Sequence, residues 1–249
     1  PRVSQGIIFW RENEAALERA AKIYGVAPEI IVAIIGVETR YGRIMGNFGV
    51  VDALSTLAFD YPPSAEFFRG QLTQHFLLSR EEGKNPLSMQ GSYAGAMGFG
   101  QFIPSSYRAY AVDFDGDGVR DIWANKTDAI GSVANYFAEH GWRGAEGVVE
   151  RVTLGDETSE LRALINSGLK PTVTVAEWRT MGVQVGPEQD DSRLATLMRM
   201  EQESGNEYWL GYDDFYVITR YNHSRLYAMA VYQLSQAIRK RRESTLDPT

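Results

Sequence analysis

Apolar residues recur at helical spacing through most of the first 140 positions. The segment 13–24 repeats them every three or four residues, which is typical of a helix with one buried face. Pro28 is suited to the first turn of a second helix, where its missing N–H costs nothing, and Gly42 can end that helix. The same spacing predicts further helices over 51–59, 64–82, 104–110 and 127–140.

The pattern changes near Gly141 to short β-branched runs between turn residues. These runs predict strands over 148–153, 172–175, 183–185, 194–200 and 207–212. Helix resumes at Asp213, and a closing helix from Arg225 ends in a basic run that suits a helix C-terminus. We therefore predict a mainly α (α+β) fold in three parts: a helical region over 1–143, a small β-rich insertion over 144–212, and a return to the helical core with a C-terminal helix over 213–249.

Composition removes several classes of function. The 249 residues carry a formal net charge of −7, so we expect no nucleic-acid partner. No uninterrupted apolar run approaches the roughly 18 residues of a membrane span. The chain has no cysteine, which excludes disulfides, thiolate metal sites and a cysteine nucleophile. It begins at Pro1 rather than Met, so we expect that an upstream segment has been removed.

Glu38 is the first candidate for chemistry. It follows Ile34 by four positions and Ile31 by seven, which places it on the apolar face of its predicted helix. Burial and the negative end of the helix dipole both favour its protonated form, as a general acid at neutral pH requires. Arg40 would act in the opposite direction. The alternative is a glutamate at a frayed helix end, hydrogen-bonded to a neighbour.

Two polar segments are further candidates. The segment 91–107 is rich in glycine, which permits close approach of the backbone to a ligand, and its polar side chains can hydrogen-bond hydroxyl and acetamido groups. The segment 219–227 carries polar-tipped residues at a predicted helix start. The alternatives are a glycine-rich turn with core aromatics for the first segment, and a helix N-cap with a packed tyrosine for the second.

An acidic turn is a candidate calcium site. Asp113, Asp115 and Asp117 are followed by Gly118, as in the first half of the D-x-D-x-D-G calcium loop, and the carbonyl of Val119 falls at the next ligand position. Position twelve of that loop is alanine here, so the closing glutamate is missing. A solvated acidic turn is the alternative.

Three blocks in this order resemble the signature of the B family of bacterial lytic transglycosylases. They are Glu38-Thr-Arg-Tyr-Gly42, Gly95-Ala-Met-Gly-Phe-Gly-Gln-Phe102 and Arg220-Tyr-Asn-His-Ser224. The intervening segments 110–118 and 128–137 are similar to the family as well, so the resemblance covers nearly the whole chain. Each block alone is weak, and the blocks in order are specific.

The resemblance implies a lysozyme-like catalytic core with flanking helices and a small inserted β-rich domain. It also implies cleavage of the β-1,4 bond between N-acetylmuramic acid and N-acetylglucosamine in peptidoglycan, by attack of the muramyl C6 hydroxyl on C1 to leave a 1,6-anhydro end. Glu38 corresponds to the single acid and base, and no cofactor is expected for catalysis. The positions that correspond to the family's sugar groove are Ser92, Tyr93, Gln101, Tyr136, Tyr221, Asn222 and Tyr227.

The resemblance also bears on the acidic turn. The family closes a longer calcium loop with an aspartate that corresponds to Asp128, with Asp121 as the alternative, and it implies that the ion is structural. Arginines associated with the groove in some members would fall near Pro63 and Ser64, which puts one contact to substrate in doubt.

Peptidoglycan glycan strands are the expected partner, with other cell-wall enzymes as further candidates, and we expect a monomer. The expected compartment is the periplasm, with the protein soluble or anchored to the outer membrane through a missing N-terminal segment. Two other functions share most of these features. A muramidase that uses water would leave hydrated product ends, and a non-catalytic, calcium-stabilised glycan-binding module would release no murein.

Overall fold

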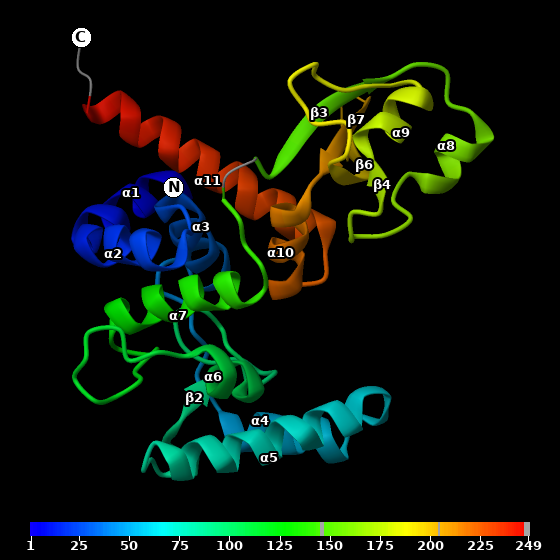
Figure 1. Ribbon diagram of the computed structural model, residues 1–249. Helices are drawn as coiled ribbons and strands as arrows, with labels where there is room; N and C mark the ends of the chain where they lie inside the picture. The colour runs from blue at the N-terminus through cyan, green and yellow to red at the C-terminus, as the bar shows by residue number, and fades with distance from the viewer. Residues whose placement is uncertain (145–146, 204, 247–249) are drawn as a thin grey trace. The chain divides into compact units, whose positions relative to one another are not determined.

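The computed structural model describes residues 1–144, 147–203 and 205–246. The chain divides into two compact units (Figure 1). The first consists of Pro1–Glu139 with Leu234–Thr249, and the second of His140–Gln233. The mainly helical α+β class that the sequence predicts is confirmed, with the larger strands gathered in the second unit.

The first unit is built from helices. They are α1 Arg2–Glu12, α2 Glu14–Tyr24, α3 Pro28–Thr39, α4 Val50–Phe59, α5 Ala65–Glu81, α6 Pro104–Tyr110 and α7 Lys126–Glu139, with short 3-10 turns at Pro62–Ser64 and Pro86–Ser88. Strands β1 Phe48–Gly49 and β2 Gln90–Gly91 pair antiparallel. The last helix, α11 Arg225–Leu246, starts in the second unit, and its end belongs to the first.

Helix α3 forms the centre of the first unit. Pro28 occupies its first turn, and the four isoleucines of the helix are at most 3% exposed. Burying each of these side chains stabilises the fold by about 1.5–3 kcal/mol. A helix that is apolar on all sides must be covered on all sides, and α1, α2 and α7 all contact α3.

No single helix in the described ranges is long and apolar enough to cross a membrane. Helices α2 and α3 reach that length and apolarity only as a pair, and the pair is bent by 115°.

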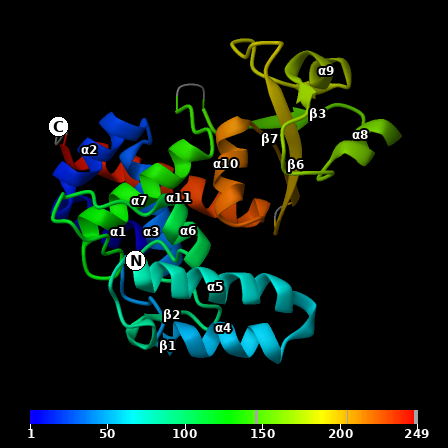
Figure 2. The same ribbon diagram turned by 60° about the horizontal axis from the view of Figure 1, so that its bottom comes forward.

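Helices α4 and α5 pack side by side (Figure 2). Two buried polar side chains of α5 contact other segments. The Gln71 side-chain oxygen accepts a hydrogen bond from the Ser105 N–H at the start of α6, at 3.0 Å. The His75 Nε2 lies 3.0 Å from the Pro86 carbonyl oxygen. These contacts join α5 to the segments before and after β2.

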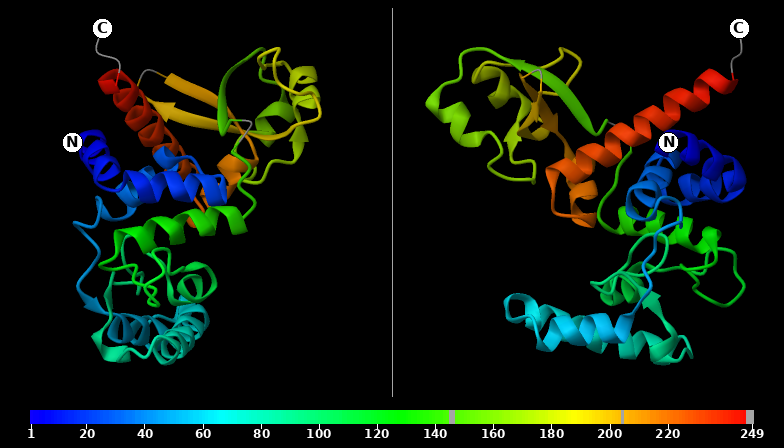
Figure 3. Two further views of the ribbon diagram at one scale, coloured as in Figure 1. Left: turned by 60° about the vertical axis from the view of Figure 1, so that its left-hand side comes forward. Right: turned by 180° about the vertical axis from the view of Figure 1, so that it is seen from behind.

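The second unit contains a five-stranded sheet with the order β4-β6-β7-β3-β5, in which every pair is antiparallel. Its strands are β3 Val149–Leu154, β4 Val173–Thr174, β5 Val183–Gln184, β6 Leu194–Gln202 and β7 Gly205–Gly211. Its helices are α8 Ser159–Leu164, α9 Val175–Thr180 and α10 Asp213–Tyr221. Strands β6 and β7 form a long hairpin, visible from two sides in Figure 3.

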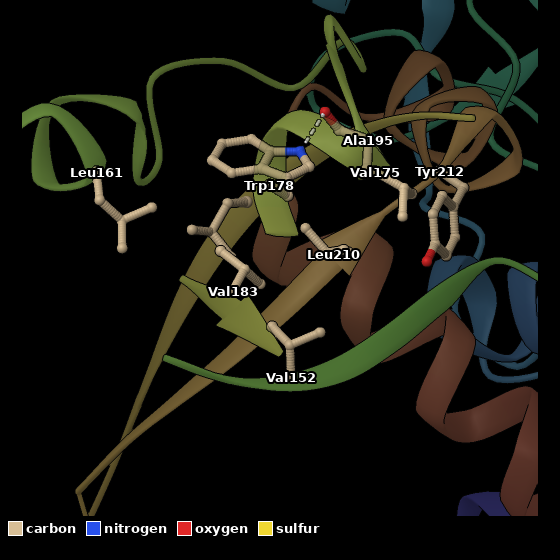
Figure 4. Packing of buried hydrophobic residues seen from close by; sticks show 9 residues of the cluster. Val152, Leu161, Val175, Trp178, Val183, Ala195, Leu210 and Tyr212 are labelled. Atoms are coloured by element: carbon tan, nitrogen blue, oxygen red, sulfur yellow. Dashed lines mark hydrogen bonds between the residues drawn. The ribbon is translucent and has the colours of Figure 1, made fainter. Parts of the chain in front are cut away.

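The second unit has its own hydrophobic core. Leu197 on β6 pairs with Leu210 on β7, and both are fully buried. Trp178 from α9 packs against this face, and its indole N–H donates to the Ala195 carbonyl at 3.3 Å (Figure 4). Leu161 carries α8 into the same cluster. All residues of this cluster lie within the second unit, so the unit has a core of its own.

This unit extends beyond the β-rich insertion expected over 144–212, whose bounds stay a prediction. The compact unit reaches from His140 to Gln233 and so includes α10. The Asp214 carboxylate on α10 accepts the N–H of Arg143 at 2.8 Å and that of Gly144 at 2.7 Å. These two hydrogen bonds bind α10 to the chain entering the sheet, so the helix belongs with the strands.

Three helices were not predicted from the sequence. Helix α1 lies at the very start of the chain, and α8 and α9 have only six residues each, too few for a period to appear. Local capping stabilises the two short helices: Thr158 caps α8, and Thr174 with Glu177 forms a capping box on α9. Of these features, the capping box of α9 is one that the sequence pattern could have revealed.

The buried His75 predicts a pH-dependent stability. Its side chain is fully buried, Nδ1 has no hydrogen-bond partner, and burial lowers its pKa below 6.5. The unfolded chain therefore takes up this proton first as the pH falls. The stability contribution is present above pH 6.5 and is lost as the pH drops through 6.5 toward the lowered pKa.

We expect urea denaturation to show the free energy of unfolding decreasing below pH 6.5, by up to about 1.4 kcal/mol per pH unit from this group. His75→Gln should remove that part of the slope, whereas His223→Gln, at an exposed position, should leave it. Equal slopes in the wild type and His75→Gln would contradict the prediction.

Candidate functional site

Glu38 is the penultimate residue of α3 and is half-buried. The sequence predicts that this helix ends at Gly42, but it ends at Thr39. Arg40, Tyr41 and Gly42 then follow in the left-handed region, with φ of 50°, 62° and 84°. Each non-glycine residue there costs about 1–2 kcal/mol, and such strain gathers at functional sites. Glu38 therefore stands directly before a strained reversal of the chain.

Hydrogen bonds and packing hold this reversal in place. The Tyr41 N–H donates to the Ile35 carbonyl at 3.2 Å, which closes the end of the helix, and the Tyr41 hydroxyl donates to the Arg2 carbonyl on α1 at 2.9 Å. The ring fits only because position 36 is glycine: a Cβ there would lie 2.5 Å from the Tyr41 hydroxyl. Burial raises the pKa of Tyr41 to about 12, so the hydroxyl remains a donor.

The glycine-rich loop of residues 91–102 contacts this reversal. The Phe99 ring leaves no space for a Cβ at Gly42, which would approach it to 2.2 Å. The Phe99 carbonyl lies 3.0 Å from the Thr39 hydroxyl, and Gln101 Nε2 donates to the Met45 carbonyl at 3.2 Å. The structure thus brings together the end of α3 and the loop that the sequence analysis singled out.

Three predicted groove residues lie on this loop. The Ser92 hydroxyl accepts the N–H of Ala94 and of Ala96, at 3.2 and 3.1 Å, and so shapes the loop. The Tyr93 side chain is 73% exposed, as a residue that meets a ligand from solvent must be. Gln101 has φ 53°, and its amide N–H groups are held by two backbone carbonyls, which fixes the orientation of its side chain.

Tyr136 on α7 is the fourth predicted groove residue in the first unit. It is 7% exposed, and its ring packs edge-on against Tyr110 with ring centroids 5.0 Å apart. Phe102, the last residue of the loop, lies 5.9 Å away by the same measure. Tyr136 is therefore largely buried and contacts the loop through Phe102.

The other three predicted groove residues belong to the second unit. Tyr221 ends α10 and is half-buried, Asn222 is exposed in an extended conformation, and Tyr227 lies in the first turn of α11. The Ser224 hydroxyl accepts the Tyr227 N–H at 3.3 Å, so Ser224 is the N-cap of α11. That these residues converge on Glu38 stays a prediction of the family resemblance.

The three carboxylates of the acidic turn lie close together. Asp113, Asp115 and Asp117 each offer an oxygen atom within 4.8 Å of the others. The Asp113 carboxylate also accepts backbone N–H groups, and that of Gly118, at 2.8 Å, contributes most to holding the pKa of Asp113 below its ordinary value. Three ionised carboxylates this close repel one another, and a hard divalent cation with oxygen ligands offsets that repulsion.

Asp128 and Asp121 perform different local tasks. Asp128 is fully buried at the start of α7, and it accepts the N–H of Phe114 at 2.7 Å and that of Asp121 at 2.8 Å. Burial raises the pKa of Asp128. The Asp121 carboxylate caps the following turn through the N–H of Trp123 and of Ala124. Asp128 thus joins the two ends of the acidic turn.

Sequence reasoning missed two contributors. The Asn125 amide donates to the Asp115 carboxylate at 2.7 Å and orients it, although Asn125 lies outside the standard loop spacing. Arg40 and Tyr41 adopt left-handed backbone conformations that their residue types do not announce. Only Gly42 beside them carried a signal.

The segments joined at Glu38 contain no second acid. Neither 39–51 nor 91–112 includes an aspartate or a glutamate. Ordinary glycosidases use two carboxylates at a set separation, one as acid and one as base or nucleophile. The site therefore offers one half-buried carboxylate at the junction of two segments that contain no other acid.

Comparison with known proteins shows which family this chain resembles. The sequence profile of the family described as "Transglycosylase SLT domain" matches residues 1–236. Over 236 residues the chain is 48% identical to the membrane-bound lytic murein transglycosylase B of Escherichia coli (strain K12). That match covers 95% of this chain and 63% of that protein, so the chain spans less than two thirds of this relative.

Solved structures agree with this result. Soluble lytic transglycosylase SltB1 from Pseudomonas aeruginosa is 53% identical and superposes with a TM-score of 0.92, over 97% of this chain and 80% of that one. The Escherichia coli lytic transglycosylase Slt35 in complex with calcium is 47% identical, with a TM-score of 0.86 over 97% of this chain and 75% of that one. These likenesses confirm the expected lysozyme-like fold class.

The contact between Gly42 and Phe99 predicts a position-specific cost of added volume. Gly42→Ala and Gly83→Ala both place a side chain at a left-handed residue, with φ of 84° and 61°. Gly83 has open space around its Cβ position, whereas Gly42 has the Phe99 ring. We expect Gly83→Ala to cost about 1–2 kcal/mol of unfolding free energy, and Gly42→Ala to cost about 1–3 kcal/mol more. Equal losses in urea denaturation would show that the ring contact is not tight.

Proposed function

The chain belongs to the transglycosylase SLT domain family, and from this premise we propose that it is a lytic transglycosylase of peptidoglycan. It cuts the β-1,4 bond between N-acetylmuramic acid and N-acetylglucosamine and leaves a 1,6-anhydromuramyl end. The observation that carries the proposal is the single carboxylate: Glu38 stands at the junction of two segments that contain no other acid. A mechanism with one carboxylate requires that the substrate supply its own nucleophile.

Glu38 acts first as acid and then as base. Its proton goes to the glycosidic oxygen as the bond from C1 of the muramyl residue to that oxygen breaks. The muramyl C6 hydroxyl oxygen then bonds to C1, and the Glu38 carboxylate takes the hydroxyl proton. Glu38 ends in its starting protonation state, and no water is consumed. The N-acetyl group of the substrate stabilises the positive charge at C1, as in substrate-assisted glycosidases.

The residues around Glu38 bind and orient the glycan. Tyr93 presents an exposed ring for a sugar face, and Gln101, fixed by two carbonyls, meets a polar substituent. Ser92 and Tyr136 shape and support the loop between them. The family resemblance assigns Tyr221, Asn222 and Tyr227 to sugar binding as well.

The acidic turn holds a structural calcium ion. Its ligands are Asp113, Asp115 and Asp117, with the Val119 carbonyl and Asp128 completing the set. The clustered oxygens of the three aspartates support this assignment, since calcium prefers six to eight oxygen ligands. The calcium complex of the related Slt35 also supports it. The ion supplies charge balance to the turn and takes no part in the reaction.

The partner is the murein glycan strand, and the compartment is therefore the periplasm, where that polymer lies. The name of the Escherichia coli relative, a membrane-bound murein enzyme, supports both statements.

Glu38→Gln tests the reaction. The amide keeps the size and polarity of the side chain but cannot donate and take up the proton, a loss typically worth about 10²–10⁴-fold. We expect the upper end of that range in the release of soluble fragments from purified murein, because the segments 39–51 and 91–112 that meet at Glu38 contain no second acid. Glu29→Gln makes the same change in the first turn of α3 and should release fragments normally. A folded Glu38→Gln variant that digests murein at the wild-type rate would refute the assignment.

Calcium should raise the melting temperature of the protein, and a chelator should lower it. Saturation at about 100 times the dissociation constant adds roughly 2.7 kcal/mol, which corresponds to about 5–10 °C for a chain of this size. Asp115→Asn should lose most of this response, whereas Asp60→Asn, an exposed acid at the end of α4, should keep it. An unchanged melting temperature in calcium and in chelator would mean that the turn binds no ion.

A further inference from the structure

We propose that Thr39 is a positioning residue for Glu38, whose buried hydroxyl fixes the last turn of α3 against the loop 91–102. This inference rests on the proposed acid–base role of Glu38. Thr39 follows Glu38 directly, and its side chain points into the protein at 0% exposure.

The Thr39 hydroxyl joins three parts of the chain. Its Oγ1 lies 3.1 Å from the Ile35 carbonyl in its own helix and 3.0 Å from the Phe99 carbonyl in the loop. It accepts the N–H of Gly42 at 3.0 Å. A hydroxyl has one hydrogen to donate and two lone pairs to accept, so the single proton is shared between the two carbonyls while the oxygen satisfies the N–H.

The neighbouring Gln101 contact reaches Met45, which lies beyond the reversal. Arg40 and Tyr41 remain left-handed only while the surrounding contacts hold them there. The Gly42 N–H that Thr39 accepts belongs to the last residue of this left-handed run. Removing the hydroxyl therefore weakens the hold on both the loop and the reversal that follows Glu38.

A displaced Glu38 would lose rate more than affinity. Proton transfer requires the donor and acceptor atoms at hydrogen-bond distance, and a shift of about 1 Å can cost about 10²-fold in rate. The sugar contacts of Tyr93 and the other groove residues are made by different side chains. The expected signature is a lower kcat with an almost unchanged KM for soluble murein glycan fragments.

The test compares four variants with the wild type, well below the lowest melting temperature in the set. Thr39→Val keeps the shape and removes the hydroxyl, and should lower kcat by about 10²-fold. Thr39→Ser keeps the hydroxyl and should retain most of the activity. Ser79→Ala removes another buried hydroxyl that donates to the carbonyl four residues earlier, 2.7 Å away, and should lose stability with kcat kept. Glu38→Gln measures the proposed function itself.

Each outcome decides something. Wild-type kcat in Thr39→Val, or equal losses in Thr39→Val and Thr39→Ser, overturns the positioning role. If kcat falls together with the melting temperature in every variant, Ser79→Ala included, Thr39 acts only on stability. That result also overturns the positioning role. If Thr39→Val does not fold, Thr39→Ala replaces it in the test, because alanine places no methyl group against the Phe99 carbonyl. The same loss of kcat is expected for Thr39→Ala. An active Glu38→Gln overturns the proposed function, whereas an inactive one beside a normal Thr39→Val overturns this inference alone.

Discussion

The end of α3 is the constraint on which the catalytic part of the molecule depends. A helix buried on all sides has to stop abruptly at a point where its last carboxylate can still meet solvent. The chain does this with three successive left-handed residues, two of which are not glycine. That conformation is costly, and it persists because a buried hydroxyl, a tyrosine fitted against glycine and a phenylalanine ring all oppose its relaxation. Glu38 takes its half-buried position from this junction.

The acidic turn is coupled to the same junction through the backbone. The Phe99 N–H donates to the Ile122 carbonyl at 3.0 Å, and a Cβ at Gly98 would lie 2.4 Å from that carbonyl oxygen. Ile122 lies between the three clustered aspartates and the buried Asp128 that joins the ends of the turn. Charge balance in the turn therefore stabilises the segment against which the glycine-rich loop packs. A cation bound in the turn would act on the site through this backbone contact, without a place in the chemistry.

The sequence predicted most of the long elements and the fold class, because helical periodicity is strong where one helix face is buried. The sequence indicated Glu38 as a candidate acid from its position on the apolar helix face. It indicated the acidic turn as a candidate calcium site from the spacing of its aspartates. The left-handed Arg40 and Tyr41 could not be predicted, since their conformation is imposed by contacts from residues such as Gly36 and Phe99 that lie elsewhere in the sequence. The role of Thr39 was hidden for the same reason: its partner Phe99 is 60 residues away. The short helices α8 and α9 depend on caps and on the local core rather than on period.

The central claim is that one carboxylate, with no second acid beside it, makes the substrate its own nucleophile. The mass of the muramyl ends released from purified murein tests this most directly. The account predicts ends lighter by one water than a hydrolysed sugar, as the anhydro ring requires, at the earliest time points. Hydrated ends as the first product would show that water attacks C1, and would contradict the account.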